Sequence, residues 1–289
     1  MKSNELPALI QDCDGYIAGL DEIDASVLDA AKQLKVISRY GVGVDRVDLK
    51  NATRLGIIVT NTPGTNSVAV AELTIGLILA LSRQLCIANQ ATHGGNWPRI
   101  SGVGLRGKVV GLVGFGQIGR EVALRLAPFG CRLIVSDPNL TQQDLQPSGV
   151  DLVTLDVLLS QADFVSLHAP SLPATQGMVN TEFLSQMKPG AFLVNTARGE
   201  LVDETALVHA LQSRRLRGAA LDCFRQEPPP PNHPLLQLHQ VILTPHTGSH
   251  TDEATFQMGQ MALQDCLAVL RGEKPNHVVN PAVFDRIGL

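Results

Sequence analysis

Three side chains in the second half of the sequence could together bind a carboxylate and move a proton. Arg198 could hold a carboxylate through two parallel N–H bonds, which would also fix the orientation of the bound molecule. His246 could give a proton in one direction of a reaction and accept it in the other, since histidine titrates near neutrality. Glu227 could fix the tautomer of that imidazole. Each residue alone could be a surface ion pair, a loop cap or a solvated carboxylate, so the hypothesis depends on their joint presence.

A glycine-rich segment supplies a second chemical signal. From Lys108 to Asp137 the chain reads as an apolar strand, a Gly-x-Gly-x-x-Gly turn, an amphipathic helix, a second strand and an acid. Gly114 allows the tight turn, Gly116 lets a pyrophosphate approach the backbone, and Gly119 lets the helix pack closely. The helix N-terminus would offer unpaired N–H groups to the phosphates. Asp137 would accept hydrogen bonds from the adenine ribose and repel a 2′-phosphate, so the segment predicts NAD rather than NADP.

Together the two features predict hydride transfer. Reduction of a 2-keto acid by a nicotinamide needs a cation for the carboxylate, an acid for the carbonyl oxygen and a group that orients the acid. Arg198, His246 and Glu227 are residues of those three types.

The elements that must position these residues are alternating strands and helices. Apolar runs near residues 109, 132, 165, 192, 219 and 241 predict six strands of a doubly wound parallel sheet. Ligands of such sheets bind outside the carboxyl ends of the strands. The residues predicted at those ends are Gly114, Asp137, His168, Thr196 to Arg198, Asp222, Pro245 and His246. Nearly every candidate for chemistry therefore falls on one edge of the sheet.

The first part of the chain alternates in the same way. Apolar runs near residues 17, 37 and 58 predict three strands, separated by helices that Asp24 and Asp48 would cap. A long helix is predicted from Ser67 to about Asn89. Its apolar part carries Glu72 and is short for a bilayer, so it reads as a buried helix.

Composition excludes several classes of protein. A net charge of −4 without a basic block argues against a nucleic-acid partner, and the polar first residues lack a signal core. The five scattered cysteines form no CxxC pair, which favours a reduced, cytoplasmic protein. No membrane partner is expected. His246 and His250 are four residues apart, but Pro245 and Gly248 favour a loop there, so no metal site is predicted.

Several short stretches follow one another in a recognisable order through most of residues 15 to 280. They include Arg39-Tyr-Gly-Val-Gly-Val-Asp45, Asn61-Thr-Pro-Gly-Thr-Asn66, Gly114–Gly119, Asn195-Thr-Ala-Arg198-Gly199, Leu221-Asp222-Cys-Phe-Arg-Gln-Glu227-Pro228 and Thr244-Pro245-His246-Thr-Gly248. In these stretches the chain resembles the D-2-hydroxyacid dehydrogenase family, and the D-3-phosphoglycerate dehydrogenases in particular. The resemblance implies an α/β protein in which a Rossmann NAD domain, residues 67–248, is inserted into a smaller flavodoxin-like substrate domain. That domain would comprise residues 1–66 and the returning tail, residues 249–289.

The resemblance also implies a role for each matching residue. Arg198, Glu227 and His246 would be catalytic, and Arg39, Val42, Gly43 and Arg198 would bind the substrate. Asp222 would hold the nicotinamide carboxamide. The full set implied for NAD binding is Val42, Gly114, Gly116, Gln117, Ile118, Gly119, Asp137, His168, Ala169, Pro170, Thr196, Ala197, Arg198, Asp222, His246 and Gly248. The expected partners are a small 2-hydroxy or 2-keto acid and a second copy of the chain, with the helix from Ser67 at the dimer interface.

Two departures from the family pattern matter. Phosphoglycerate enzymes usually carry Arg-Ser after their Gly-φ-Ile-Val strand, facing the substrate phosphate, whereas this chain has Asp21 and Glu22 nearby, which would repel a phosphate. The family's substrate domain also opens with a strand, a helix and a second strand before the position of Gly15. Here about fourteen mostly polar residues stand there, so we expect an N-terminally truncated domain.

The sequence leaves the substrate and part of the function open. Hydroxypyruvate, glyoxylate, 3-phosphohydroxypyruvate and longer 2-keto acids need the same core chemistry, and the D stereochemistry rests on the resemblance alone. The leading hypothesis is an NAD-dependent oxidoreductase. The alternatives are an NAD-sensing, corepressor-like binding protein and a catalytically impaired truncated form.

Overall fold

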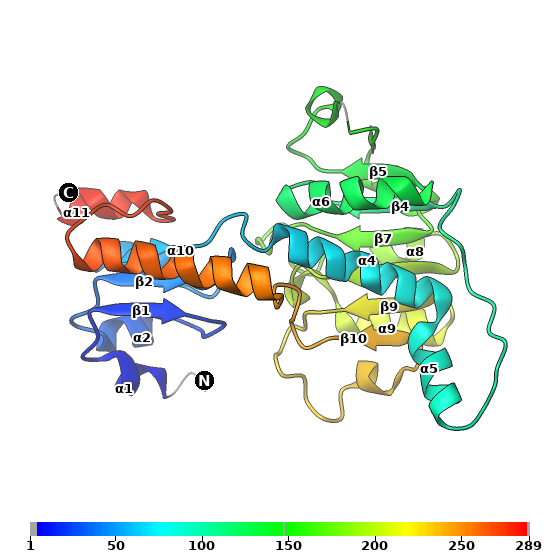
Figure 1. Cartoon of the computed structure of the whole chain (residues 1–289), viewed down its shortest axis with the longest axis horizontal. Helices are drawn as coiled ribbons and strands as arrows, with labels where there is room; N and C mark the ends of the chain where they lie inside the picture. The colour runs from blue at the N-terminus through cyan, green and yellow to red at the C-terminus, as the bar shows by residue number, and fades with distance from the viewer. Residues whose placement is uncertain (1–4, 147, 288–289) are drawn as a thin grey trace. The chain divides into compact units, whose positions relative to one another are not determined.

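The computed structural model describes residues 5–146 and 148–287, in two compact units. One unit comprises residues 1–66 with 250–289, and the other comprises Ser67–Ser249 (Figure 1). Residues 1–4 of the predicted polar N-terminal stretch lie outside the described residues.

The Ser67–Ser249 unit is built on a parallel sheet of seven strands in the order β10-β9-β8-β7-β4-β5-β6. Its strands are β4 (Val109–Val113), β5 (Arg132–Ser136), β6 (Asp151–Leu152), β7 (Phe164–Leu167), β8 (Ala191–Asn195), β9 (Leu216–Leu221) and β10 (Val241–Leu243). The chain order reverses between β4 and β7, which is where ligands of doubly wound sheets bind. The predicted Rossmann-type sheet is therefore confirmed.

Helices cover both faces of this sheet. The helices are α4 (Ser67–Arg83), α5 (Leu85–His93), α6 (Gln117–Leu126), α7 (Leu155–Gln161), α8 (Thr181–Gln186) and α9 (Glu204–Gln212). Alternate strand residues point to opposite faces, so Leu112 and Val194 pack with α4 and α6, whereas Val165 and Leu193 pack with α7 to α9. Figure 1 shows α4 and α6 across one face, with α8 and α9 behind. Short 3₁₀ turns follow the strands and helices at Ala127–Phe129, Gln142–Leu145, Gly199–Leu201 and Pro234–Gln237.

Two details of the sequence prediction were wrong, and one element was not predicted. The sheet has a seventh strand, β6, whose two residues are too short to give an apolar period. The long helix predicted from Ser67 breaks at Gln84, which takes a left-handed conformation (φ 52°) and separates α4 from α5. The mostly polar N-terminal stretch, for which the sequence predicts no element, contains α1 (Leu6–Ile10), which buries Leu6 and Ile10.

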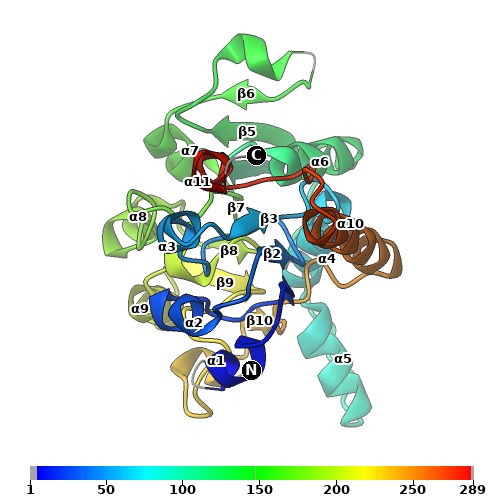
Figure 2. The same cartoon turned by 90° about the vertical axis from the view of Figure 1, so that its left-hand side faces the viewer.

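The other unit has three parallel strands in the order β1-β2-β3, the number that the sequence predicts. They are β1 (Gly15–Ala18), β2 (Val36–Arg39) and β3 (Ile58–Thr60). Its helices are α1, α2 (Ala25–Ala30), α3 (Leu49–Arg54), α10 (Asp252–Leu270) and α11 (Phe284–Ile287), with a 3₁₀ turn at Pro281–Val283. Figure 2 shows α2 and α3 on one side of these strands and α10 on the other. Asp24 and Asp48 cap α2 and α3 as predicted.

Among the described residues, no single helix is long and apolar enough to cross a membrane. Only α4 and α5 taken together reach that length and composition, and they meet at a 64° bend.

Candidate active site

A histidine–glutamate pair lies beyond the carboxyl ends of β9 and β10. The Nδ1 atom of His246 is 2.9 Å from Oε1 and 3.0 Å from Oε2 of Glu227. Glu227 Oε1 also accepts the backbone N–H of Phe224 at 3.1 Å. The side chains of His246 and Glu227 remain 24% and 15% exposed. A carboxylate at Nδ1 selects the tautomer or protonation state in which that nitrogen carries hydrogen, and leaves Nε2 for chemistry.

The backbone that carries His246 is held by one buried carboxylate. Asp222 is 1% exposed, and its Oδ1 accepts the Thr244 hydroxyl at 2.5 Å and the Thr247 amide at 2.9 Å. Its Oδ2 accepts the Gly248 amide at 2.8 Å. His246 itself has a left-handed backbone (φ 53°), which is costly for a residue with a Cβ and persists only where its surroundings fix it. The hydrogen bonds to Asp222 provide that fixing.

Arg198 lies in the loop after β8, at the same edge. Asn195 closes this loop, because its side chain donates to the Arg198 carbonyl at 2.8 Å and accepts the Ala197 amide at 3.0 Å. The Arg198 guanidinium donates to the Ala197 carbonyl at 2.7 Å. A Cβ at Gly199 would collide with the backbone of Phe224, so the glycine lets this loop pack against the one that leads to Glu227.

Cys223 is a neighbour of the pair that sequence reasoning did not assign. It is 3% exposed, and its Sγ lies 3.4 Å from the Ala197 carbonyl oxygen. Burial first, and then the nearby carboxylates of Asp222 and Glu227, raise the pKa of the Cys223 thiol well above its ordinary value. The thiol is therefore protonated at neutral pH and is a poor nucleophile.

The glycine turn after β4 has the geometry that each glycine needs. Gly114 has φ +91°, and a Cβ there would lie 2.8 Å from the His168 carbonyl. A Cβ at Gly119 would lie 2.8 Å from the Gly114 carbonyl oxygen, whereas a Cβ at Gly116 would meet nothing within 4 Å. The space beside Gly116 is therefore open for a ligand, at the N-terminus of α6, where Gln117 and Ile118 begin the helix.

Two further strand ends line the same edge. Asp137, after β5, accepts the Phe115 amide at 2.9 Å through Oδ2 and thereby braces the glycine turn. His168 follows β7 and precedes Ala169 and Pro170; its Nε2 lies 3.0 Å from the Ser166 hydroxyl, and burial lowers its pKa to about 4. It is neutral at physiological pH. Thr196 is buried, and its hydroxyl lies 2.8 Å from that of Thr74 in α4.

In the other unit, Arg39 ends β2, and Val42 and Gly43, also predicted to bind substrate, lie in the loop that follows. Arg39 is 4% exposed and donates to the carbonyls of Ala18 and Gly43, each at 3.1 Å. Asn61 donates to the Val42 carbonyl at 2.8 Å. The Val42 and Gly43 amides donate to no other group in the described part of the chain. The carbonyls of Val42 and Gly43 are therefore already hydrogen-bonded, whereas their N–H groups could bind an anion.

The comparisons with known proteins agree with this geometry. Residues 75–248 match the family described as D-isomer specific 2-hydroxyacid dehydrogenase, NAD binding domain. The chain is 44% identical over 289 residues to a glyoxylate reductase of Thermofilum pendens, covering 97% of this chain and 85% of the relative. It belongs to the D-isomer specific 2-hydroxyacid dehydrogenases.

Two further relatives place the chain within this family. It is 41% identical to human D-3-phosphoglycerate dehydrogenase over 283 residues, 97% of this chain but only 53% of the human protein. The structure of an Aquifex aeolicus D-lactate dehydrogenase complexed with NAD and lactic acid superposes with a TM-score of 0.88 at 29% identity, covering 95% of this chain and 89% of that one. As a member of the family, the protein is an NAD-dependent oxidoreductase that acts on a CH–OH group.

The strand-end residues fit NAD. Open space at Gly116, the helix N-terminus behind it and a carboxylate after β5 are the features that a pyrophosphate and an adenine ribose require. Sequence reasoning missed the supports of the site: the Phe224 amide on Glu227, Thr244 and Thr247 on Asp222, and the close packing at Gly199. Each of these residues stands in one of the stretches that carry the family resemblance, but nothing in the sequence marks it as a support of the site.

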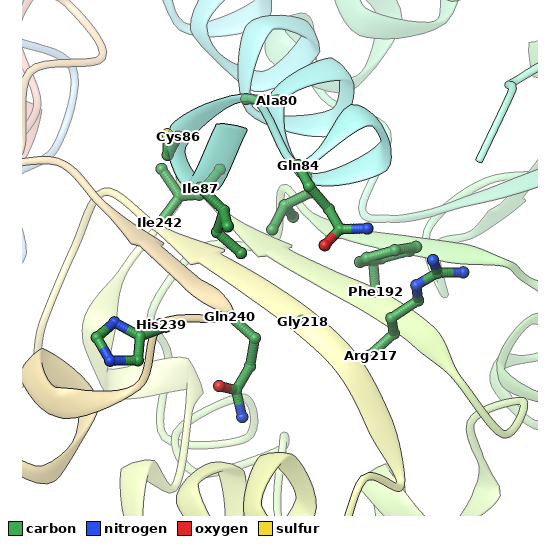
Figure 3. Close-up of a pocket in the computed structure, with 11 residues that line it drawn as sticks. Ala80, Gln84, Cys86, Ile87, Phe192, Arg217, Gly218, His239, Gln240 and Ile242 are labelled. Atoms are coloured by element: carbon green, nitrogen blue, oxygen red, sulfur yellow. The ribbon is translucent and has the colours of Figure 1, made fainter. Parts of the chain in front are cut away.

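A separate hollow lies at the opposite end of the same sheet (Figure 3). Arg217 and Gly218 at the start of β9, Gln240 before β10, and Cys86 and Ile87 of α5 line it. It is thus at the amino ends of the strands, away from His246.

Proposed function

We propose that the enzyme reduces a small, unphosphorylated 2-keto acid such as glyoxylate or hydroxypyruvate to the D-2-hydroxy acid, with His246 as the acid. The contact between His246 Nδ1 and both oxygens of Glu227 carries this proposal. Bound NADH supplies the hydride. His246 gives its proton from Nε2 to the carbonyl oxygen, Glu227 holds the ring through Nδ1, and the reverse reaction returns the proton to Nε2.

Arg198 is the proposed cation for the substrate. Its guanidinium can bind a carboxylate through two N–H groups and polarise a neighbouring carbonyl. The Val42 and Gly43 amides are proposed to receive the carboxylate as well, since their carbonyls are already held by Asn61 and Arg39. We assign Arg39 to positioning this loop.

The choice of an unphosphorylated substrate rests on the residues after β1. Asp21 lies there, and its carboxylate accepts the Tyr16 hydroxyl at 2.8 Å. Phosphoglycerate enzymes resemble this chain but usually carry Arg-Ser at this place, and a carboxylate would repel a phosphate. The Thermofilum pendens relative, named a glyoxylate reductase, also covers the chain and supports this choice.

The test is NADH oxidation with glyoxylate, hydroxypyruvate, 3-phosphohydroxypyruvate and a longer 2-keto acid. We expect kcat/KM for the best unphosphorylated acid to exceed that for the phosphorylated one by about 10-fold or more. His246→Ala should lower kcat by about 10²-fold or more, as expected for loss of a general acid. His239→Ala, an exposed histidine of the same unit, is the matched control. Preference for the phosphorylated acid would contradict the substrate assignment.

We also propose a cytoplasmic homodimer that associates through α4, α5 and the loop after them. Apolar side chains are exposed along this segment: Val68 is 42% exposed, Leu85 52% and Trp97 83%. A mass measurement by light scattering should give twice 30.9 kDa, and Trp97→Glu should shift the mass toward that of one chain. A wild-type mass of one chain would refute the dimer.

A further inference from the structure

The acid–base pair has a third side chain beside it that could bind a metal ion. Cys223, Glu227 and His246 each offer one ligand atom, and these atoms all lie within 4.8 Å of one another. The sequence alone does not predict this cluster, because Cys223 and Glu227 lie in the loop after β9 and His246 lies in the loop after β10.

The three ligand types are those of zinc sites. Thiolate, imidazole and carboxylate all bind Zn²⁺, and three protein ligands with one open position make a complete tetrahedral site. Bond lengths of about 2.0–2.3 Å place tetrahedral ligand atoms about 3.3–3.7 Å from one another. Side-chain rotations that move the Cys223 sulfur and the Glu227 oxygen by roughly 1 Å would therefore bring the three ligand atoms to bonding distance of one ion.

Carboxylates outnumber the cation near the cluster. The charges of Asp222, Glu227 and Glu200 act on the Cys223 thiol against one guanidinium, that of Arg198, so the net charge around the position is negative. His246 and Glu227 are each partly exposed, which leaves a path for an ion and for a water at its fourth position.

We propose that Cys223, Glu227 and His246 form a reversible Zn²⁺ site that switches the enzyme off. On binding, the Cys223 thiol loses its proton to solvent, and the coordinating His246 nitrogen gives up any proton it carries to solvent or to the other ring nitrogen. The sulfur and that nitrogen each donate an electron pair to the ion, and a Glu227 oxygen becomes the third ligand. The hydrogen bond between His246 and Glu227 breaks, and no electron is transferred. With the ion bound, His246 is no longer oriented to give a proton to the keto acid.

Cys223 decides the selectivity of this site. Without sulfur, only one carboxylate and one imidazole remain, which is a weak pair of ligands for zinc. Mg²⁺ and Ca²⁺ prefer sites made of oxygen and should neither bind here nor inhibit.

The first test measures binding directly on the whole chain, freed of metal by a chelator. Zn²⁺ binding is followed by equilibrium dialysis, and Co²⁺ serves as a spectroscopic substitute for zinc. We expect Co²⁺ to produce a thiolate-to-metal charge-transfer band and tetrahedral d–d bands in the wild type. Cys223→Val keeps an apolar side chain of similar size and should abolish the charge-transfer band. Cys86→Ser, which removes an exposed cysteine, should keep it.

The second test measures inhibition, with each variant compared with its own metal-free rate. The Zn²⁺ concentration for half inhibition should rise by 10-fold or more in Cys223→Val and stay unchanged in Cys86→Ser. Absence of a thiolate band in the wild type, or equal Zn²⁺ binding by Cys223→Val, would overturn the proposal. The binding and spectral measurements need no keto acid, so they test the zinc site even if the proposed substrate is wrong. If Cys223→Val does not fold, the presence or absence of the thiolate band in the wild type still tests the proposal.

Discussion

The Nδ1 atom of His246 is shared by the two carboxylate oxygens of Glu227, at 2.9 and 3.0 Å, while the His246 backbone is left-handed. The imidazole is thus fixed from both ends, by its ring nitrogen and by its own main chain. A ring held in this way needs little reorganisation before it transfers a proton.

Glu227→Gln tests this orientation. The amide keeps the size of the side chain but removes the charge and one acceptor, so the ring loses its unique tautomer. We expect kcat to fall by about 10-fold or more with little change in the Kd of NADH. Steady-state kinetics and NADH fluorescence titration measure the two quantities. An unchanged kcat would show that Glu227 does not orient the acid.

Asp137 should decide the choice of cofactor. Asp137→Ser removes the negative charge after β5 and a proposed hydrogen bond to the ribose, and such charged hydrogen bonds contribute about 1.5–3 kcal/mol. We expect kcat/KM for NADH to fall by about 10-fold or more, and the ratio of NADPH to NADH use to rise. Because Asp137 also accepts the Phe115 amide, a thermal melt must show that the variant is folded. An unaltered cofactor ratio would contradict the assignment.

His168 should make the cofactor-free protein sensitive to mild acid. Burial lowers its pKa from 6.5 to about 4, so between these values the unfolded chain binds a proton that the native chain does not. Stability from this residue is therefore complete above pH 6.5 and declines as the pH falls toward 4, by about 2 kcal/mol at pH 5. Urea unfolding at pH 7 and pH 5 measures the loss. His168→Gln should lose less stability than the wild type over this interval, and an equal loss would count against a neutral His168.

Two glycines should respond differently to the same substitution. Gly199→Ala places a Cβ against the Phe224 backbone, so we expect a lower Tm and a severe loss of turnover. Gly116→Ala places its Cβ in open space, so the Tm should be preserved while NADH binding weakens by about 10-fold. Differential scanning fluorimetry and NADH titration distinguish the two. A stable, active Gly199→Ala variant would refute the packing argument.

The sequence by itself determined the nucleotide-binding unit. The strand, glycine turn, helix, strand and acid from Lys108 to Asp137 are contiguous, so their spacing specifies the local geometry. Strand ends were predictable for the same reason, because buried parallel strands are continuous apolar runs. The sequence did not predict β6 or the break at Gln84. A two-residue strand and a one-residue break are too short to change the spacing of apolar residues along the chain.

Only the tertiary structure decided which residues surround His246, the proposed proton donor. Glu227 and His246 are 19 residues apart, and the hydrogen bond between them depends on how the loops after β9 and β10 fold. That folding depends on Asp222 as an acceptor for the second loop and on Gly199 as a point of close backbone contact. Cys223 lies beside the pair for the same reason. No local pattern encodes such contacts, because they are set by packing between segments that are distant in the chain.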